Sequence, residues 1–419
     1  MKHVATLGAL ALCLLSPSAL AELPYQIVDT NQTSAYGQGL GQDAHFVGAS
    51  PTYRDNDDGT VSDTVTALMW TQDPGEKITY AEAVKRASSL RTGGYNDWRL
   101  PTIKELYSLI QLNGVDPDPK ANSSANLRPF IDDSVFAFAY GDVSKGERII
   151  DAQYVSATQY VSTTMNQNDT VFGVNFADGR IKGYPIKNRR GEKTFFALYV
   201  RGNPEYGQNQ FVDNQDGTIT DEATGLTWMK ADSGQGMDWP DALAYAGSAT
   251  FAGHSDWRLP NAKELQSIID YSRSPDTTDS AAIDPLFEST AIANEAGQKD
   301  FAHYWTNTTH VSTRSNRAAT YFAFGRSLGW MGRDGQKQLM DVHGAGSQRS
   351  DPKTGDPAKL PFGRGPQGDV VRINNLVRLV RGGAVEPVDA PIVEQSARQR
   401  RAPPGEGSEA RPQRRARSQ

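Results

Sequence analysis

The sequence predicts an α+β protein made of two tandem modules, each with two helices and several short antiparallel strands. Three observations predict this fold class: an internal repeat, two helix-start signals in each copy, and short strand-like runs in the last third of each copy. A module of this kind buries its core between the helices and the strands. The length of 419 residues is sufficient for two such modules.

The internal repeat sets the domain boundaries. An Asp-rich turn at 55–63 recurs at 213–221, and Asn-Asp-Trp-Arg-Leu-Pro at 96–101 recurs as Ser-Asp-Trp-Arg-Leu-Pro at 255–260. We pair 160–164 with 304–308, and each copy closes on a Val-Arg-Gly segment. The repeat therefore predicts module one at 53–202, a short polar linker at 203–210 and module two at 211–383. Module two contains an insert, 334–372, without a counterpart in module one.

Each copy opens with a predicted hairpin. Its turn carries Gly59 or Gly217 between short strand-like runs, and glycine suits a turn position with positive φ. The strand that follows contains Trp70 or Trp228. We expect both copies to begin with the same small antiparallel sheet.

Two helices follow in each copy. Thr79 with Glu82 is a capping box that predicts a helix over 81–90. In copy two, Asp238 is the expected N-cap, with proline in the first turn. The second helix starts after the Leu-Pro step, where the capping pairs are Thr102 with Glu105 and Asn261 with Glu264. The last third of each copy is predicted as short strands at 171–176, 195–200, 320–324 and 376–380.

The two ends of the chain differ from the modules. Residues 1–21 have the short basic start, apolar run and small-residue cleavage site of a secretory signal peptide, and 22–52 form an N-terminal extension. The only cysteine, Cys13, lies inside this signal, so the mature chain is expected to lack disulfides and cysteine-bound metals. No later run is long enough to span a membrane. The basic tail, 384–419, lacks apolar periodicity and is predicted to be disordered.

The net charge of the chain argues against nucleic acid as a partner. The formal net charge is −6, and the tail is basic, so the modules themselves are acidic. An acidic body does not favour nucleic acid as a partner. The metalloprotease motif His-Glu-x-x-His is absent from the sequence. The pattern therefore favours a binding protein over an enzyme.

The repeated motifs resemble those of the Lcl C-terminal domain family. The residues that carry the resemblance are the Asp-x-x-Asp-Gly-Thr-x-x-Asp turn, the Gly-Leu-x-Trp strand at 225–228, the Asp-Trp-Arg-Leu-Pro segment and the closing Val-Arg-Gly. Copy one departs from the pattern with Ala67 in place of the glycine. The resemblance implies a fold like the C-type lectin and formylglycine-generating-enzyme group, a bacterial surface or periplasmic location, and glycosaminoglycan binding as in the adhesin that gives the family its name.

Calcium is the one cofactor for which the sequence offers ligands. The candidate carboxylates belong to Asp55, Asp57, Asp63, Asp213, Asp216 and Asp221. A calcium loop of the EF-hand type requires glycine at its sixth position and a distal glutamate, whereas Gly59 and Gly217 are fifth. We therefore favour the plain hairpin interpretation.

The tryptophans and the residues beside them have a structural interpretation. Besides Trp70 and Trp228, this set consists of Trp98, Arg99, Glu105, Trp257, Arg258 and Glu264. We expect the tryptophans to anchor the core and the glutamates to cap helices. An Asp–Arg pair, with Asp97 or Asp256, is expected to tie the loop to the next helix. The functional alternatives are a sugar-stacking tryptophan, or lectin-style calcium ligands at Asn96 and Asp97.

Two basic, aromatic loops are the candidate ligand-binding residues. They consist of Tyr184, Lys187, Arg189 and Arg190 in module one and Arg314, Arg317, Arg326 and Trp330 in module two. Arginine forks suit sulfate and carboxylate groups, and aromatic rings suit sugar faces. The other interpretation is a solvated charged surface.

Together these features predict an exported binding or adhesion protein, located in the periplasm, on the cell surface or outside the cell. It would recognise glycans or another extracellular polymer, or a surface protein, through the loop faces of its modules. One alternative is an enzyme of unknown reaction with its site near the insert, and loss of activity on changing His343 to Ala would favour it. Another is a structural envelope protein. The sequence leaves the ligand and the oligomeric state open.

Overall fold

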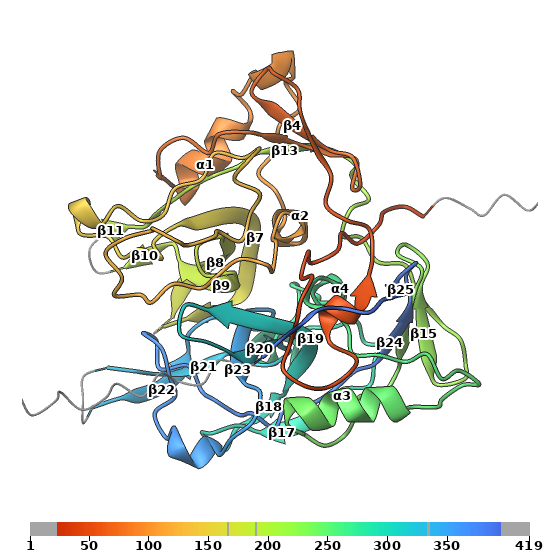
Figure 1. Ribbon diagram of the computed structural model, residues 1–419. Helices are drawn as coiled ribbons and strands as arrows, with labels where there is room; N and C mark the ends of the chain where they lie inside the picture. The colour runs from red at the N-terminus through yellow and green to blue at the C-terminus, as the bar shows by residue number, and fades with distance from the viewer. Residues whose placement is uncertain (1–22, 166, 189–190, 333–335, 395–419) are drawn as a thin grey trace, which may run out of the picture.

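The computed structural model describes residues 23–165, 167–188, 191–332 and 336–394. Module one, orange to yellow, lies above module two, green to blue (Figure 1). The predicted signal peptide at 1–21 lies outside the described residues. None of the helices within the described ranges has the length and apolar character needed to cross a membrane.

Both modules follow one plan: a four-stranded antiparallel sheet, two helices, and a three-stranded antiparallel sheet. The elements of module one are β3 (Tyr53–Asp55), β4 (Thr60–Asp63), β5 (Leu68–Thr71), α1 (Tyr80–Ala87), α2 (Ile103–Ser108), β7 (Gln153–Thr164), β8 (Asn168–Asn175), β9 (Arg180–Pro185) and the closing strand β13 (Val200–Gly202). Those of module two are β14 (Phe211–Asp213), β15 (Thr218–Asp221), β16 (Leu226–Met229), α3 (Trp239–Ser248), α4 (Ala262–Ser267), β19 (His303–Ser312), β20 (Ser315–Ala323), β23 (Gln348–Pro352) and β24 (Val380–Gly382). The class is α+β with strands predominating, 33% against 13% helix.

Smaller elements join or edge these units. The short strand pairs are β6 (Ile78–Thr79) with β12 (Thr194–Phe195), β10 (Lys187–Asn188) with β11 (Gly191–Glu192), β17 (Ala291–Ala293) with β18 (Lys299–Phe301), and β21 (Leu328–Met331) with β22 (Gln338–Asp341). One more helical turn, α5 (Pro275–Thr278), follows α4.

The predicted hairpins and helix starts are confirmed. Gly59 and Gly217 sit in the turns of β3–β4 and β14–β15 with φ of 82° and 86°. The Thr102–Glu105 and Asn261–Glu264 capping boxes are both formed. The side chain of Asp238 caps α3 through the backbone N–H of Asp241. These signals are local in sequence, which is why they could be interpreted without the tertiary structure.

The pairing of 160–164 with 304–308 was wrong. Thr158 Oγ1 accepts from the Ile103 backbone N–H at 3.0 Å, as Thr308 Oγ1 does from Ala262 at 3.0 Å. The counterpart of 304–308 is therefore 154–158. The sequence Tyr-Val-Ser occurs twice in this region, at 154 and at 160, and only the contacts with α2 and α4 show which copy is equivalent.

The proposed insert, 334–372, also needs correction because it contains β23. This strand pairs with β20 as β9 pairs with β8, with Tyr321 opposite Arg349 and Gly173 opposite Lys182. It is therefore the third strand of the module-two sheet. The extra chain of module two lies before and after β23, and the strand was missed because little in its sequence is apolar.

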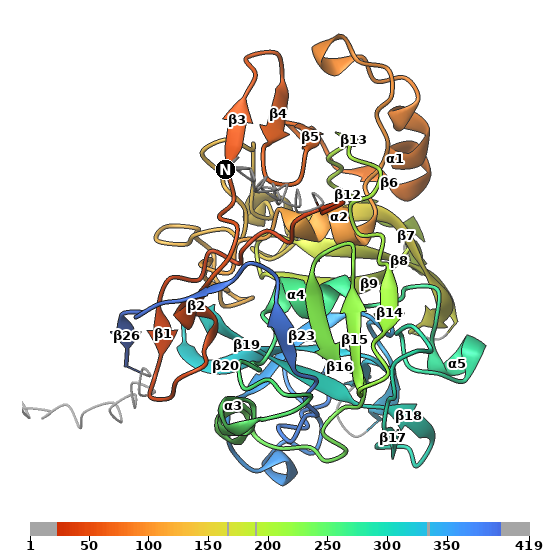
Figure 2. The ribbon, with the colours of Figure 1, turned by 90° about the vertical axis from the view of Figure 1, so that its right-hand side faces the viewer.

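The tail prediction fails for residues 384–394. They form β25 (Glu386–Pro387), which pairs with β2 (Phe46–Val47), and β26 (Ile392–Val393), which pairs with β1 (Ala35–Tyr36). The N-terminal extension in turn packs on module two, since Gln32 Nε2 donates to the Thr309 carbonyl at 2.8 Å. Figure 2 shows β1, β2 and β26 together beside module two. Residues 395–419 lie outside the described residues.

The two modules share one hydrophobic core that includes residues of α2 and α4. A reciprocal contact joins these helices: Lys104 Nζ donates to the Ser267 carbonyl at 2.6 Å, and Lys263 Nζ donates to the Ser108 carbonyl at 2.8 Å. Burial lowers the pKa of both lysines to about 8. The modules are therefore packed together through equivalent faces.

Candidate functional site

The Asp-rich turns use their carboxylates to hold the turns themselves. Asp216 accepts from the N–H and the hydroxyl of Thr218 at 2.9 and 2.6 Å, and Asp213 accepts from Lys230 Nζ at 2.6 Å. Asp55, Asp63 and Asp221 likewise accept backbone N–H groups within two residues. Asp57 occupies a turn position with φ of 57°. In the described ranges no three His, Cys, Asp or Glu residues are grouped so that they could hold a metal ion.

The tryptophans of the repeated motif are buried. Trp70 and Trp228 are fully buried in the shared core. Trp98 and Trp257 each donate an indole N–H, at 3.1 Å, to the carbonyl of the residue six positions earlier. These positions leave the rings no free face for a sugar.

The neighbouring arginines pair with the capping glutamates, not with the preceding aspartates. Arg99 binds Glu105, and Arg258 binds Glu264 at 2.6 Å. The expected Asp–Arg pair forms instead with the closing strand, where Asp97 meets Arg201 at 2.7 Å and, in module two, Asp256 meets Arg381 at 2.8 Å. One loop of each module is thus tied both to the second helix and to the closing strand.

The candidate ligand-binding residues of module one are scattered. Lys187 is 71% exposed and pairs with Glu192. Tyr184 is buried, and the Lys193 ammonium lies 4.2 Å from the centre of its ring. Arg189 and Arg190 lie outside the described residues.

Module two brings two of its candidates to one place. Arg314 and Arg317 line the same cleft. Arg326 instead pairs with Asp276 and Asp300. Trp330 is half-buried, edge-on to Phe362 with ring centres 5.7 Å apart.

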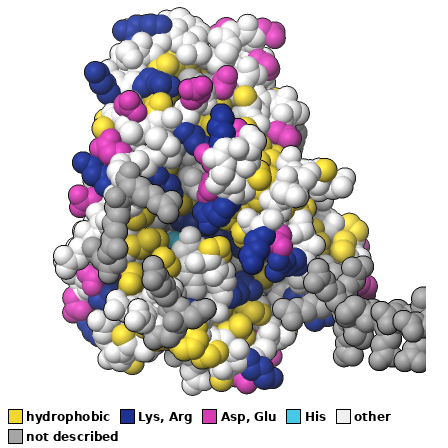
Figure 3. Space-filling view, turned by 90° about the vertical axis from the view of Figure 1, so that its left-hand side faces the viewer, with side chains coloured by type: hydrophobic (Ala, Val, Ile, Leu, Met, Phe, Trp, Pro, Cys, Tyr) yellow, Lys and Arg dark blue, Asp and Glu magenta, His cyan; other side chains and the backbone are white. Residues whose placement is uncertain are grey.

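A cleft of about 440 Å³ lies between the two modules. Lys and Arg side chains gather in the middle of the face shown in Figure 3. The charged residues that line the cleft are Arg180, Lys182, Arg314, Arg317, Arg349 and Arg364 with Asp116, Asp118, Asp178 and Asp369. Six cations against four carboxylates make the cleft basic, although the whole chain carries −6. We call it the intermodule cleft.

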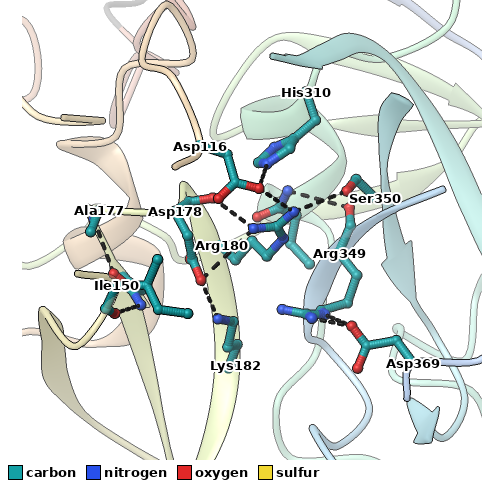
Figure 4. A network of polar contacts seen from close by, with 12 residues as sticks. Asp116, Ile150, Ala177, Asp178, Arg180, Lys182, His310, Arg349, Ser350 and Asp369 are labelled. Atoms are coloured by element: carbon teal, nitrogen blue, oxygen red, sulfur yellow. Dashed lines mark hydrogen bonds and ion pairs between the residues drawn. The ribbon is translucent and has the colours of Figure 1, made fainter. Parts of the chain in front are cut away.

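Ion pairs hold the floor of this cleft (Figure 4). Asp116, from module one, binds Arg180 at 2.9 Å and the Nε2 of His310, from module two, at 3.2 Å. On the other side, Asp369 binds Arg349 and, at 3.0 Å, the Nε2 of His343. Each module therefore supplies part of one connected network.

The charges of the network are set by burial and by these partners. Burial opposes ionisation of Asp116, but Arg180 and His310 outweigh it and hold the pKa of Asp116 below its usual range. Arg349 does the same for the pKa of Asp369, again against the effect of burial. Burial lowers the pKa of His310 and of His343 to about 4, so both imidazoles are neutral at neutral pH.

One hydrogen-bond donor at the floor of the cleft is not used by any other group of the described chain. Arg349 Nη1 is buried and has no hydrogen-bond partner within the described chain. In Figure 4 this guanidinium contacts Asp369 on one side and faces Lys182 on the other. Lys182 is bound to Asp178, and burial lowers its pKa to about 8. Two cations that face each other across a cleft favour an anionic group between them.

A family model described as the Lcl C-terminal domain matches residues 59–201 and 217–340. The two matches together cover more than half of the chain. The chain belongs to the Lcl C-terminal domain family. Neither the curated proteins nor the solved structures compared with it include a match.

The intermodule cleft is a product of having two Lcl C-terminal domains. Module one supplies the wall with Arg180 and Lys182, and module two supplies the wall with Arg314 and Arg349. The second family match ends at residue 340, so β23 and the loop with Arg364 and Asp369 lie beyond it.

A second cavity of about 280 Å³ continues the cleft, since both are lined by Lys182 and Pro366. It adds Arg148, Lys193 and His343. His343, on which the enzyme alternative rests, is 1% exposed, and its Nδ1 has no partner within the described residues. This cavity extends the basic surface of the Lcl C-terminal domain pair.

Sequence reasoning found Arg314 and Arg317 but missed most of the floor. Asp116 and His310 are 194 residues apart and meet only through domain packing. Arg349 and Arg364 lay in a segment that was treated as an insert. The one usable signal was the excess of arginine after residue 312.

Proposed function

We propose that this protein is exported and binds an acidic glycan, or another anionic extracellular polymer, in the intermodule cleft. The observation that carries the proposal is the set of six cations gathered in one cleft of an otherwise acidic chain. Guanidinium and ammonium groups recognise carboxylate and sulfate through charge-assisted hydrogen bonds. The site lies between the modules, not on the loop face of each.

The ligand would be bound both at the floor and at the rim of the intermodule cleft. An anionic group would bridge Lys182 and Arg349 at the floor, where Arg349 Nη1 is unpaired within the described chain. Arg314, 70% exposed, and Arg317 would attract the rest of the polymer at the rim. Buried donors fix the position of the bound anionic group, whereas exposed charges mainly raise the rate at which the protein and the ligand associate.

Export and a lectin-like fold belong to the same proposal. The pattern at 1–21 and the absence of cysteine after Cys13 support export to the periplasm, the cell surface or the medium. Membership of the Lcl C-terminal domain family supports a C-type lectin-like arrangement of each module and an adhesive role.

The test is a binding screen of residues 22–394 on neutral, carboxylated and sulfated glycans, with calcium and with chelator. We expect acidic glycans to bind, binding to weaken as salt is raised, and chelator to have no effect. The absence of binding to every acidic glycan at low salt would contradict the proposal. Protein partners would then be examined with the same segment.

The affinity should depend on pH through Lys182, which lines the intermodule cleft, and Lys193, which lines the adjoining cavity. Burial lowers the pKa of Lys182 and of Lys193 to about 8. Both are charged below pH 8 and neutral above it, so affinity for an acidic glycan should fall between pH 7 and 9, by up to about tenfold per pH unit for each proton lost. Calorimetry at constant ionic strength measures this fall.

The matched control is a variant in which both side chains stay positively charged at high pH. Lys182→Arg combined with Lys193→Arg should flatten the pH profile, because arginine does not titrate in this range. Arg349 occupies the strand position equivalent to Lys182, so this position of the sheet accepts an arginine. An unchanged fall in the double variant would show that other groups are responsible.

A further inference from the structure

Exposed aromatic rings are concentrated at one place on module two. Among the described residues, three aromatic side chains are exposed: Tyr245 at 40%, Phe251 at 39% and Phe362 at 52%. Tyr245 and Phe251 line the same pocket of about 440 Å³. Exposed rings that share a pocket mark a ligand site more often than isolated ones do. We call this the aromatic pocket.

The aromatic pocket is built on elements that both modules share, but with side chains that only module two has. Tyr245 lies on α3, away from the helix face that buries Ala242 and Ala246. Phe251 lies against Gly217, where a Cβ atom would approach its ring to 2.7 Å. Any side chain at 217 would therefore displace the ring that forms this wall.

Module one lacks these rings. The carbonyls of Thr92 and Phe251 accept the equivalent indole N–H bonds, which makes the two residues equivalent. Counting from the N-caps Thr79 and Asp238, Tyr245 corresponds to Arg86. The aromatic pocket is thus a feature of module two alone, and the plan of the fold does not require it.

The charges of the aromatic pocket do not suit an anion. Its charged lining consists of Lys230, Asp232 and Glu288. Lys230 is bound to Asp213 at 2.6 Å, and Asp232 accepts from Thr290 and Tyr304. The exposed carboxylate of Glu288 accepts no hydrogen bond within the described chain, and Lys230 is its electrostatic neighbour. The site therefore offers two apolar rings and a hydrogen-bond acceptor.

We propose that the aromatic pocket binds a neutral sugar ring. A pyranose has an apolar C–H face, which would pack on Tyr245 and Phe251, and a rim of hydroxyls. These hydroxyls would donate to Glu288 and bond to the exposed Thr250. The pocket is separate from the intermodule cleft and shares no lining residue with it. The protein would then recognise two chemically different parts of a glycan surface.

The experiment titrates the protein, residues 22–419, with neutral hexasaccharides of glucose, xylose, mannose, galactose and N-acetylglucosamine by calorimetry. We expect at least one to bind, and Tyr245→Ala or Phe251→Thr to weaken it by about tenfold. Tyr245→Ala places a good helix former on an exposed helix face, and threonine is the residue of module one at the position of Phe251.

Phe362→Ala is the matched control, because Phe362 is exposed but lies outside the pocket. It should leave neutral-sugar binding unchanged, as should Arg317→Glu in the intermodule cleft. Binding of no neutral hexasaccharide would overturn the inference, as would binding that both pocket variants retain. Choline is included as a probe, and binding of choline in place of sugar would also overturn it. Acidic glycans measured in parallel report on the intermodule cleft separately.

Discussion

Arg258→Ala should lower the free energy of unfolding by about 3–5 kcal/mol, the range for removing one partner of a buried ion pair. The side chains of Arg258 and Glu264 are only 6% and 3% exposed. The substitution leaves the Glu264 carboxylate buried beside the first turn of α4. Arg258 also donates to the Gly382 carbonyl of the closing strand, and this contact is lost as well. Urea denaturation followed by tryptophan fluorescence measures the change.

Module one provides a control for this prediction. The equivalent Arg99 is 38% exposed, so water can reach Glu105 once the guanidinium is removed. Arg99→Ala should therefore cost only about 1 kcal/mol. Equal losses for the two variants would show that burial of the pair does not determine its contribution.

Reversing two charges at the rim of the intermodule cleft should abolish most binding. Arg314→Glu with Arg317→Glu should weaken the affinity for an acidic glycan by about 100-fold at low salt. Arg314 is 70% exposed and Arg317 is exposed too. The reversal breaks the surface ion pair of Arg314 with Asp118, and such a pair contributes little, so the loss of folding free energy should be small. The effect should shrink as salt is raised, because exposed charges are screened. Calorimetry at two salt concentrations measures both quantities.

Lys187→Glu is the control that changes the net charge of the protein without changing the cleft. Lys187 is 71% exposed, was named from the sequence in the same way, and does not line the cleft. Its reversal should change the affinity less than twofold, roughly the effect of a distant screened charge. A loss equal to that of the rim variant would mean that overall charge, not the cleft, attracts the ligand.

The capping boxes and the turn glycines of each module were predictable, because each depends only on residues that are close in sequence. The Thr102–Glu105 and Asn261–Glu264 boxes, and the glycines at 59 and 217, set local backbone geometry. The third strand of module two was not predictable, because its buried residues include the polar Arg349 and Asp351. Their burial depends on an ion pair and on backbone contacts with loops that are distant in sequence. Sequence alone also left two possible partners for 304–308.

The sequence by itself determined the number of modules, their opening hairpins and helix starts, and their tryptophan anchors, because these follow from local propensity and from a repeated pattern. The tertiary structure decided where the two modules meet. Lys104 and Lys263 join α2 to α4 by donating to backbone carbonyls, and a carbonyl acceptor has no signature in the sequence. That packing brings Asp116 to His310 and places Arg180 across from Arg349. The intermodule cleft therefore exists only in the folded pair.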